Sequence, residues 1–303
     1  MRKLIREGNI KPAPMFQLDK FIGPDGRPNE ETRRMLKETI VEAEKIVHDD
    51  VLIDEVAFNR AQTNREANYA RRVDPLVRQR DIKTEPIAIV GYGPSLLQTW
   101  PRLRQFKHIW STSKAHDFLL QRGIRPERHL DLDPQPHKAE FLTKPQKDIE
   151  YLLSTHINPA YLDKLDAAGI RPKMFHVDIS KGRDLRDPRY FGYKARFDIG
   201  AQAAEIAFRD GWRDQHWFGI EYGCPNKQSH AGVHWGPGSK AMQFRVSCAG
   251  KVYWTNLMFF HGLMLAETLL CDRALLKPTL HGDVLLYHFL KCRGRVPRVK
   301  CEV

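Results

Sequence analysis

A glycine turn at the end of an apolar run is the sharpest chemical signal in this sequence. The run Ile87–Val90 leads into Gly-Tyr-Gly-Pro-Ser, after which a helix is expected to begin. Glycine lets a backbone approach a phosphate closely, and a helix N-terminus offers unpaired N–H groups to an anion. A tight strand-to-helix turn with a serine N-cap is the structural alternative. The turn is not a P-loop, and Leu96 replaces the third glycine of the dinucleotide fingerprint. The expected nucleotide-binding residues are Gly91, Gly93, Pro94 and Ser95.

Two acids, Asp131 and Asp133, stand two residues apart in the segment Leu-Asp-Leu-Asp-Pro. On a strand this spacing places both carboxylates on one face, and Pro134 indicates that the strand ends there. Such a pair can hold a divalent cation that bridges a diphosphate, or one acid can bind a ribose or acceptor hydroxyl. Because Asp before Pro is also common in turns, that structural alternative stays open.

Two histidines, His230 and His234, lie in a long polar stretch after the apolar run His216–Ile220. A loop histidine titrating near neutral pH can act as a general base toward an acceptor hydroxyl or amine. The spacing of four would also suit a metal pair on a helix, but Gly232 argues against a helix here. We therefore take His230 as the candidate catalytic base.

Short apolar runs alternate with helix-like segments from residue 86 onward. This alternation predicts βαβ crossovers and hence an α/β fold, a Rossmann-like doubly wound, mostly parallel sheet with helices on both faces. Ligands of such folds bind at the carboxyl ends of the strands. The expected strands are Pro86–Val90, His108–Ser113, His129–Leu132, Asp148–Ser154, Met174–Ile179 and His216–Ile220, and the expected helices are Ser95–Leu103, His116–Arg122, Pro159–Ala168 and Ala201–Asp210.

Three parts of the chain differ in composition. Residues 1–85 are expected to form an arm and a helical region, with one helix over Glu30–His48. Six arginines between Arg60 and Arg80 suggest either a solvated helix face or an anion-binding collar. Residues 86–290 form the expected nucleotide-binding transferase domain, which closes with a hairpin and the apolar helix Leu257–Leu270. Residues 291–303 are expected to be a basic tail.

Composition and charge narrow the protein class. The 303 residues are 42% apolar and 28% charged, which is typical of a folded globular protein. Five scattered cysteines suit neither a structural zinc site nor an oxidised framework, and no segment resembles a signal peptide or is long enough to span a bilayer. We therefore expect a cytoplasmic protein. The net charge of +12 favours anionic partners, such as nucleotides or nucleic acid, although it can also serve solubility alone.

Taken in order, these motifs resemble the 6-hydroxymethylpterin diphosphokinase MptE-like family, which includes the motility accessory factor glycosyltransferases and is distantly similar to bacterial sialyltransferases. The resemblance rests on the glycine turn, on Gly123-Ile-Arg-Pro leading to the acid pair, and on Phe-Gly-Ile-Glu-Tyr (218–222) followed by Ser-His-Ala (229–231). It covers about Pro86 to Leu290. Where relatives commonly have Gly-x-Asp, this chain has Gly219-Ile-Glu221, whose longer carboxylate reaches differently.

The resemblance implies a transferase that takes a nucleotide or nucleotide sugar as substrate. His230 and Asp133 would be catalytic, while Asp131, Asp133 and Glu221 would hold Mg²⁺ or Mn²⁺. A glycosyltransferase with a nucleotide-sugar donor is the first interpretation. The first alternative is diphosphate transfer from ATP to a hydroxymethyl group on a pterin or a modified base. The second is a nucleotide- or nucleic-acid-binding module without turnover, which the basic charge would suit.

Overall fold

The computed structural model describes most of the chain from residue 55 onward, together with one short strand near the start. The described residues are 15–17, 55–77, 81–178, 187–190, 192–194, 198–226, 228–231, 233–234, 243–248 and 250–303. The expected helix at 30–48 lies outside them, as do Arg78 and Arg80 of the arginine-rich segment.

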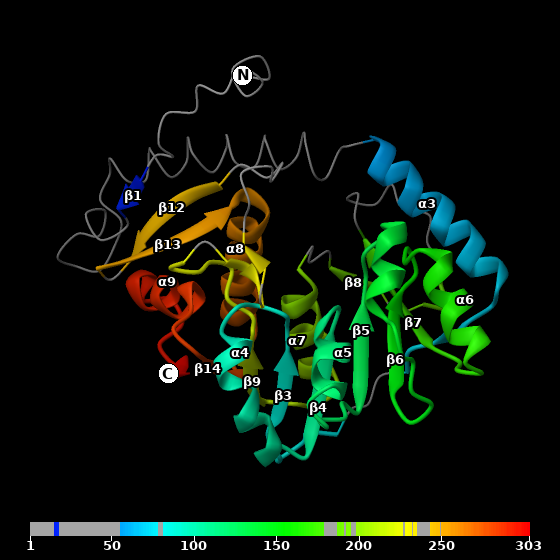
Figure 1. Cartoon of the computed structure of the whole chain (residues 1–303), viewed down its shortest axis with the longest axis horizontal. Coiled ribbons are helices and arrows are strands. Elements are labelled where there is room, and N and C mark those ends of the chain that lie inside the picture. Colours follow the sequence, from blue (N-terminus) through cyan, green and yellow to red (C-terminus); the bar gives the residue numbers. More distant parts are fainter. Residues whose placement is uncertain are drawn as a thin grey trace.

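A ten-stranded sheet forms the centre of the molecule, and every strand pair in it is parallel (Figure 1). This confirms the predicted α/β fold. In spatial order the strands are β15 (Lys300–Glu302), β14 (Lys277–His281), β9 (Asp214–Phe218), β3 (Ile87–Val90), β4 (His108–Thr112), β5 (Arg128–Asp131), β6 (Glu150–Ser154), β7 (Lys173–Asp178) and β2 (Asp74–Pro75), with β8 (Gly192–Lys194) also paired to β7.

The order of the strands reverses once. From β3 the chain moves outward through β4, β5, β6 and β7, and it then returns to place β9 on the other side of β3. At such a reversal the connections leave the two neighbouring strands toward opposite faces of the sheet. This opens a crevice beyond their carboxyl ends, where ligands bind in folds of this class.

Side chains of the central strand alternate between two apolar cores, which explains why helices cover both faces. Ile87 and Ile89 pack in a core with residues of α7 (Ile199–Arg209) and α8 (Leu257–Asp272). Ala88 and Val90 join a second core on the opposite face. That core contains residues from α4 (Leu96–Thr99), the 3₁₀ helix η3 (Trp100–Gln105) and α5 (Ala115–Leu120). A third core packs α6 (Pro159–Ala167) against β6 and β7.

The segment before residue 86 packs against the α/β domain. Helix α3 (Glu55–Ala70) lies beside α6 (Figure 1), and β2 pairs with β7. Arg65 of α3 is fully buried and donates a hydrogen bond to the carbonyl of Val177. Asn68 donates to the carbonyls of Thr155 and Ile157 at 3.0 and 2.8 Å. Polar side chains of α3 thus dock onto loops of the sheet, while the division of the chain after residue 85 stays a prediction.

The residues that were expected to form a basic tail include the last strand of the sheet. They follow α9 (Leu285–Arg293) and form β15, which pairs with β14. Arg298 donates hydrogen bonds to the carbonyls of Leu276 and Arg273, at 2.7 and 3.0 Å. Part of the tail's positive charge is therefore used to attach the last strand to the sheet.

Smaller elements complete the described chain. The predicted hairpin is present as β12 (Gln243–Cys248) and β13 (Lys251–Asn256), and β1 (Met15–Gln17) adds to its edge. The thiols of Cys248 on β12 and Cys292 on α9 lie 2.9 Å apart. A short hairpin is formed by β10 (Gln228–His230) and β11 (Val233–His234).

Among the described helices, none has the length and apolar character needed to cross a bilayer.

Candidate functional site

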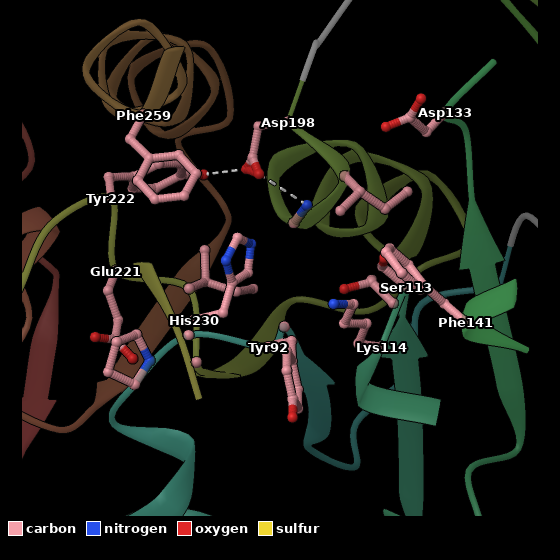
Figure 2. A pocket seen from close by; sticks show the side chains of 18 of the residues that line it. Tyr92, Ser113, Lys114, Asp133, Phe141, Asp198, Glu221, Tyr222, His230 and Phe259 are labelled. Carbon is pink, nitrogen blue, oxygen red and sulfur yellow. Dashed lines mark hydrogen bonds between the residues drawn. The ribbon is translucent and has the colours of Figure 1, made fainter. Parts of the chain in front are cut away.

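A pocket of about 340 Å³ opens at the carboxyl ends of β9, β3, β4 and β5, where the strand order reverses. Its lining comes from the glycine turn after β3, the loops after β4 and β5, the start of α7, the loop after β9 and the β10 hairpin. Figure 2 shows Ser113, Lys114 and Phe141 on one side of it and Glu221 and His230 on the other. The fold thus gathers residues that are more than one hundred positions apart in the sequence.

The glycine turn lines the pocket, and its glycines also allow it to contact the turn after β9. The Gly93 N–H donates to the carbonyl of Gly219 at 2.8 Å. A Cβ atom on Gly93 would lie 2.6 Å from that carbonyl oxygen and 2.6 Å from Oε1 of Glu221. Gly219 itself has a positive φ of 61°, which favours glycine. The turn after β3 and the turn after β9 therefore touch backbone to backbone. Of the four residues predicted to bind a nucleotide, Gly91, Gly93 and Pro94 line the pocket, whereas Ser95 is not part of its lining.

Ser95 is held by partners within the protein. Its backbone N–H donates to Oε1 of Glu221 at 2.5 Å, and its hydroxyl donates to the carbonyl of His281 at 3.3 Å. Glu221 is buried, and burial raises the pKa of its carboxyl to about 7 against the lowering effect of the Ser95 hydrogen bonds. A side-chain carboxylate thus occupies the position at the start of α4 where the sequence predicted a phosphate.

The acid pair lies at the floor and rim of the pocket. Asp131 ends β5 and is 2% exposed, and its Oδ1 accepts hydrogen bonds from the N–H groups of Leu132 and Asp133. Its Oδ2 is buried and has no hydrogen-bond partner among the described residues. Burial, with a smaller contribution from Asp133, raises the pKa of Asp131 to about 6. Asp133 lies at the rim, where Lys138 forms an ion pair with it at 3.0 Å.

The three carboxylates predicted to hold a metal do not form one group. Asp133 and Glu221 lie at opposite sides of the pocket in Figure 2, and Glu221 is engaged by Ser95. In the part of the chain that the structure describes, no three acidic, histidine or cysteine side chains lie close enough to hold a metal ion. These residues therefore do not provide a three-carboxylate site for Mg²⁺ or Mn²⁺, and whether a metal accompanies a bound nucleotide stays a prediction.

His230 lies at the mouth of the pocket. Its ring is 6.4 Å from the ring of Tyr92 and 5.8 Å from that of Phe259, measured between centroids. The N–H of Ala231 donates to the Tyr92 carbonyl at 2.9 Å, which attaches the β10 hairpin to the glycine turn. The residue as a whole has an exposed part at the mouth. Burial of the ring still lowers the pKa of His230 to about 4, and the positive charges of Lys138 and Lys114 lower this pKa further. The imidazole is therefore neutral at pH 7, the state that a general base requires.

Asp198 and Tyr222 form a part of the wall and were not among the predicted site residues. Asp198 caps α7 by accepting hydrogen bonds from the N–H groups of Gly200 and Ala201, and the Tyr222 hydroxyl donates to it at 2.6 Å (Figure 2). Gly262 of α8 makes room for the Tyr222 ring, because a Cβ there would lie 2.7 Å from it. A glycine inside the apolar run Leu257–Leu270 was the available signal for this close contact.

Comparison with known proteins identifies the family. The sequence profile of the 6-hydroxymethylpterin diphosphokinase MptE-like family matches residues 59–219, more than half of the chain. The chain belongs to this family. The match begins within α3, in agreement with the packing of that helix on the domain, and it ends before Glu221 and His230. No curated protein matches the sequence.

Two solved structures are similar to this MptE-like chain. The MAf glycosyltransferase from Magnetospirillum magneticum AMB-1 has 13% identity and a TM-score of 0.54, over 80% of this chain and 42% of that one. The chain therefore spans less than half of that protein's length, and the likeness shows a shared fold. A mammalian sialyltransferase in complex with Gal-beta-1-3GalNAc-ortho-nitrophenol has 9% identity and a TM-score of 0.34, over 89% of this chain and 90% of that one. The second likeness is too low to add to the fold assignment.

Proposed function

We propose that this MptE-like protein is a group transferase that binds a nucleotide-activated donor in the pocket, with a nucleotide sugar as the first candidate. The observation that carries the proposal is the position of the pocket at the reversal of strand order, with buried carboxylates and a neutral histidine in its lining. A donor bound at the carboxyl ends of β3 and β4 would have its activated group within the same cavity as His230.

The chemistry of such a transfer is divided among the lining residues. Oδ2 of Asp131 is a buried acceptor without a partner among the described residues, so a donor hydroxyl would satisfy it. His230 would accept the proton of the attacking acceptor hydroxyl, since its imidazole is neutral at pH 7. The rest of the rate enhancement would come from holding donor and acceptor in the reactive orientation.

A second candidate is diphosphate transfer from ATP to a hydroxymethyl group. The observation that favours it is the family match itself, since the family is described by that activity. The two reactions differ in the donor and in the bond that breaks. Glycosyl transfer breaks the bond between the sugar and the phosphate of the nucleotide, which leaves as a nucleoside phosphate. The diphosphokinase reaction breaks the bond between the α- and β-phosphates of ATP and releases AMP.

A binding panel followed by product analysis tests both candidates. Calorimetric titrations would use UDP-, GDP- and CMP-linked sugars, ATP and GTP, each with and without Mg²⁺. Tight binding of one nucleotide sugar, with transfer of its sugar to an added acceptor, would support the first candidate. Binding of ATP with release of AMP in the presence of a hydroxymethylpterin would support the second. A protein that binds nucleotides or nucleic acid but turns over neither donor would be the binding module instead.

A further inference from the structure

Two lysines on the wall opposite Glu221 face the same aromatic ring. Lys114 follows β4, and Lys138 belongs to the 3₁₀ helix η4 (Pro136–Phe141) after β5. Their ammonium nitrogens lie 4.0 and 5.1 Å from the centroid of the Phe141 ring. Both lysines and Phe141 line the pocket, and Figure 2 shows Lys114 beside Phe141. Neither lysine was among the residues that the sequence predicted for the site.

The backbone before Lys114 is in an uncommon conformation. Ser113 has a φ of 46°, which is rare for a residue other than glycine, and its N–H donates to the Leu130 carbonyl. This turn ends β4 and sets the direction in which the chain enters α5, with Lys114 as the first residue after it. Backbone strain of this kind concentrates at sites that bind or react. It is a separate indication that the loop after β4 has a functional role.

The positive groups in this part of the pocket repel one another. Enclosure lowers the pKa of Lys114, and the charge of Lys138 lowers it further. The same two lysines act on His230 in the same direction. Lys138 is paired with Asp133 at 3.0 Å, whereas Lys114 forms no ion pair with the residues that the structure describes. A bound polyanion would remove this repulsion and supply Lys114 with a counter-charge.

The opposite wall is unfavourable for phosphates. The backbone N–H of Ser95 already donates to Glu221, and the ionised form of Glu221 would repel another anion there. Within one pocket, the wall of Glu221 therefore offers a carboxyl group, whereas the opposite wall offers two ammonium groups, one of them paired with Asp133. Phosphates bound at Lys114 and Lys138 would lie within this cavity of about 340 Å³, because both lysines line it.

We propose that Lys114 and Lys138 bind the phosphate groups of a nucleoside diphosphate moiety, and that the glycine turn after β3 does not. This inference rests on the proposed function for the nucleoside part of the ligand. It assigns the phosphates to the loops after β4 and β5, so the activated end of the donor would lie between the lysine wall and His230.

Charge-removing variants of the two lysines test the assignment. The panel would contain UDP, GDP, CDP and ADP with their parent nucleosides, titrated calorimetrically into wild type, Lys114→Met and Lys138→Met. Each variant should weaken the binding of the diphosphate by at least about tenfold, because a charge-assisted hydrogen bond is lost. The affinity for the nucleoside should stay within about twofold. Lys144→Met is the matched control, since Lys144 is exposed and does not line the pocket.

Two further measurements separate the possible failures. If diphosphates bind both lysine variants as tightly as wild type, while Glu221→Gln tightens their binding, the phosphates lie at the glycine turn and the assignment is wrong. If wild type binds no member of the panel, the proposed function fails, and inorganic pyrophosphate then tests the lysine wall alone. Pyrophosphate should protect Lys114 of wild type from acetylation by acetic anhydride, read by peptide mass spectrometry, whereas Lys144 should stay reactive. Equal acetylation of Lys114 with and without pyrophosphate would overturn the inference without any variant.

Discussion

The carboxylate of Glu221 accepts a hydrogen bond of 2.5 Å from the backbone N–H of Ser95. This contact joins the loop after β9 to the turn after β3, so it spans the two strands between which the chain reverses direction. It also explains how a glycine turn that resembles a phosphate-binding loop can be satisfied within the protein. Glu221 is 5% exposed, and its neighbours hold it where water cannot easily stabilise its charge.

Replacing Glu221 should change how stability depends on pH. Burial raises its pKa to about 7, whereas the ordinary pKa of a glutamate side chain is 4.5. Between these values the folded protein retains a proton that the unfolded chain has released, so the free energy of unfolding falls as the pH rises. Glu221→Gln cannot titrate, and the difference between variant and wild type should grow in favour of the variant by up to about 3 kcal/mol from pH 4.5 to above 7. Denaturant unfolding at several pH values measures this difference, and a difference independent of pH would contradict the assignment.

Removal of the imidazole should affect turnover more than donor binding. His230→Ala should lower kcat by about 100-fold or more, because proton transfer by a positioned base contributes that much, while the KM for the donor changes little. His288→Ala is the control, since His288 lies on α9, pairs with Asp283 and is not part of the pocket lining. A wild-type rate that falls only below about pH 4 would agree with the lowered pKa of His230. Unchanged kcat in His230→Ala would remove it from the mechanism.

A methyl group on Gly93 should separate the two central strand ends. The added Cβ would lie 2.6 Å from both the Gly219 carbonyl oxygen and Glu221 Oε1. We expect Gly93→Ala to lower the free energy of unfolding by about 1–3 kcal/mol, the usual cost of overpacking, and to weaken nucleotide binding by deforming the pocket. Gly123→Ala offers a comparison, because no atom lies within 4 Å of a Cβ there and its positive φ of 69° alone causes strain. Equal stability of Gly93→Ala and wild type would show that the turn has room to move.

The thiol pair on β12 and α9 should respond to mild oxidation. The sulfur atoms of Cys248 and Cys292 are 2.9 Å apart, within contact distance for bond formation. Diamide should therefore convert the two thiols to one disulfide, the reagent taking up two protons and two electrons, and two fewer thiols should react with a thiol reagent under denaturing conditions. Cys292→Ser should abolish this loss, whereas Cys271→Ser, which changes an exposed cysteine, should not. Peptide mapping without reductant identifies the bond formed.

The central part of the fold could be read from the sequence because its signals are local. The apolar run at residues 87–90 is buried on both faces, as a central parallel strand must be, and Asn158 before Pro159 gives a helix start that needs no tertiary information. The strand β14 was missed: its segment begins with Lys277 and Pro278, which do not suggest a strand. Its place is decided by pairing with β9 and β15, and pairing depends on distant residues.

The candidate site was predicted in part for the same reason. The glycine turn, Asp131 and His230 have recognisable neighbours in the sequence, and all three reach the pocket. Lys114 stands alone between a serine and an alanine, and nothing nearby distinguishes it from other surface lysines. Its role depends on the position of Phe141 after the next strand, which only the packing of η4 provides. The contact between Glu221 and Ser95 joins residues 126 positions apart and left no local signal.

The pairing of β3 with β9 sets a condition on how the protein folds. The two strands are neighbours in the sheet, yet β4 through β8 and their helices lie between them in the sequence. During synthesis the half of the sheet from β3 to β7 can pair in the order in which it leaves the ribosome. One edge of β3 stays unpaired until β9 has been synthesised, and pairing across so long a loop is slow. Until then the backbone N–H and C=O groups on that edge of β3 have no strand beside them, so this edge is open to pairing with another chain during synthesis.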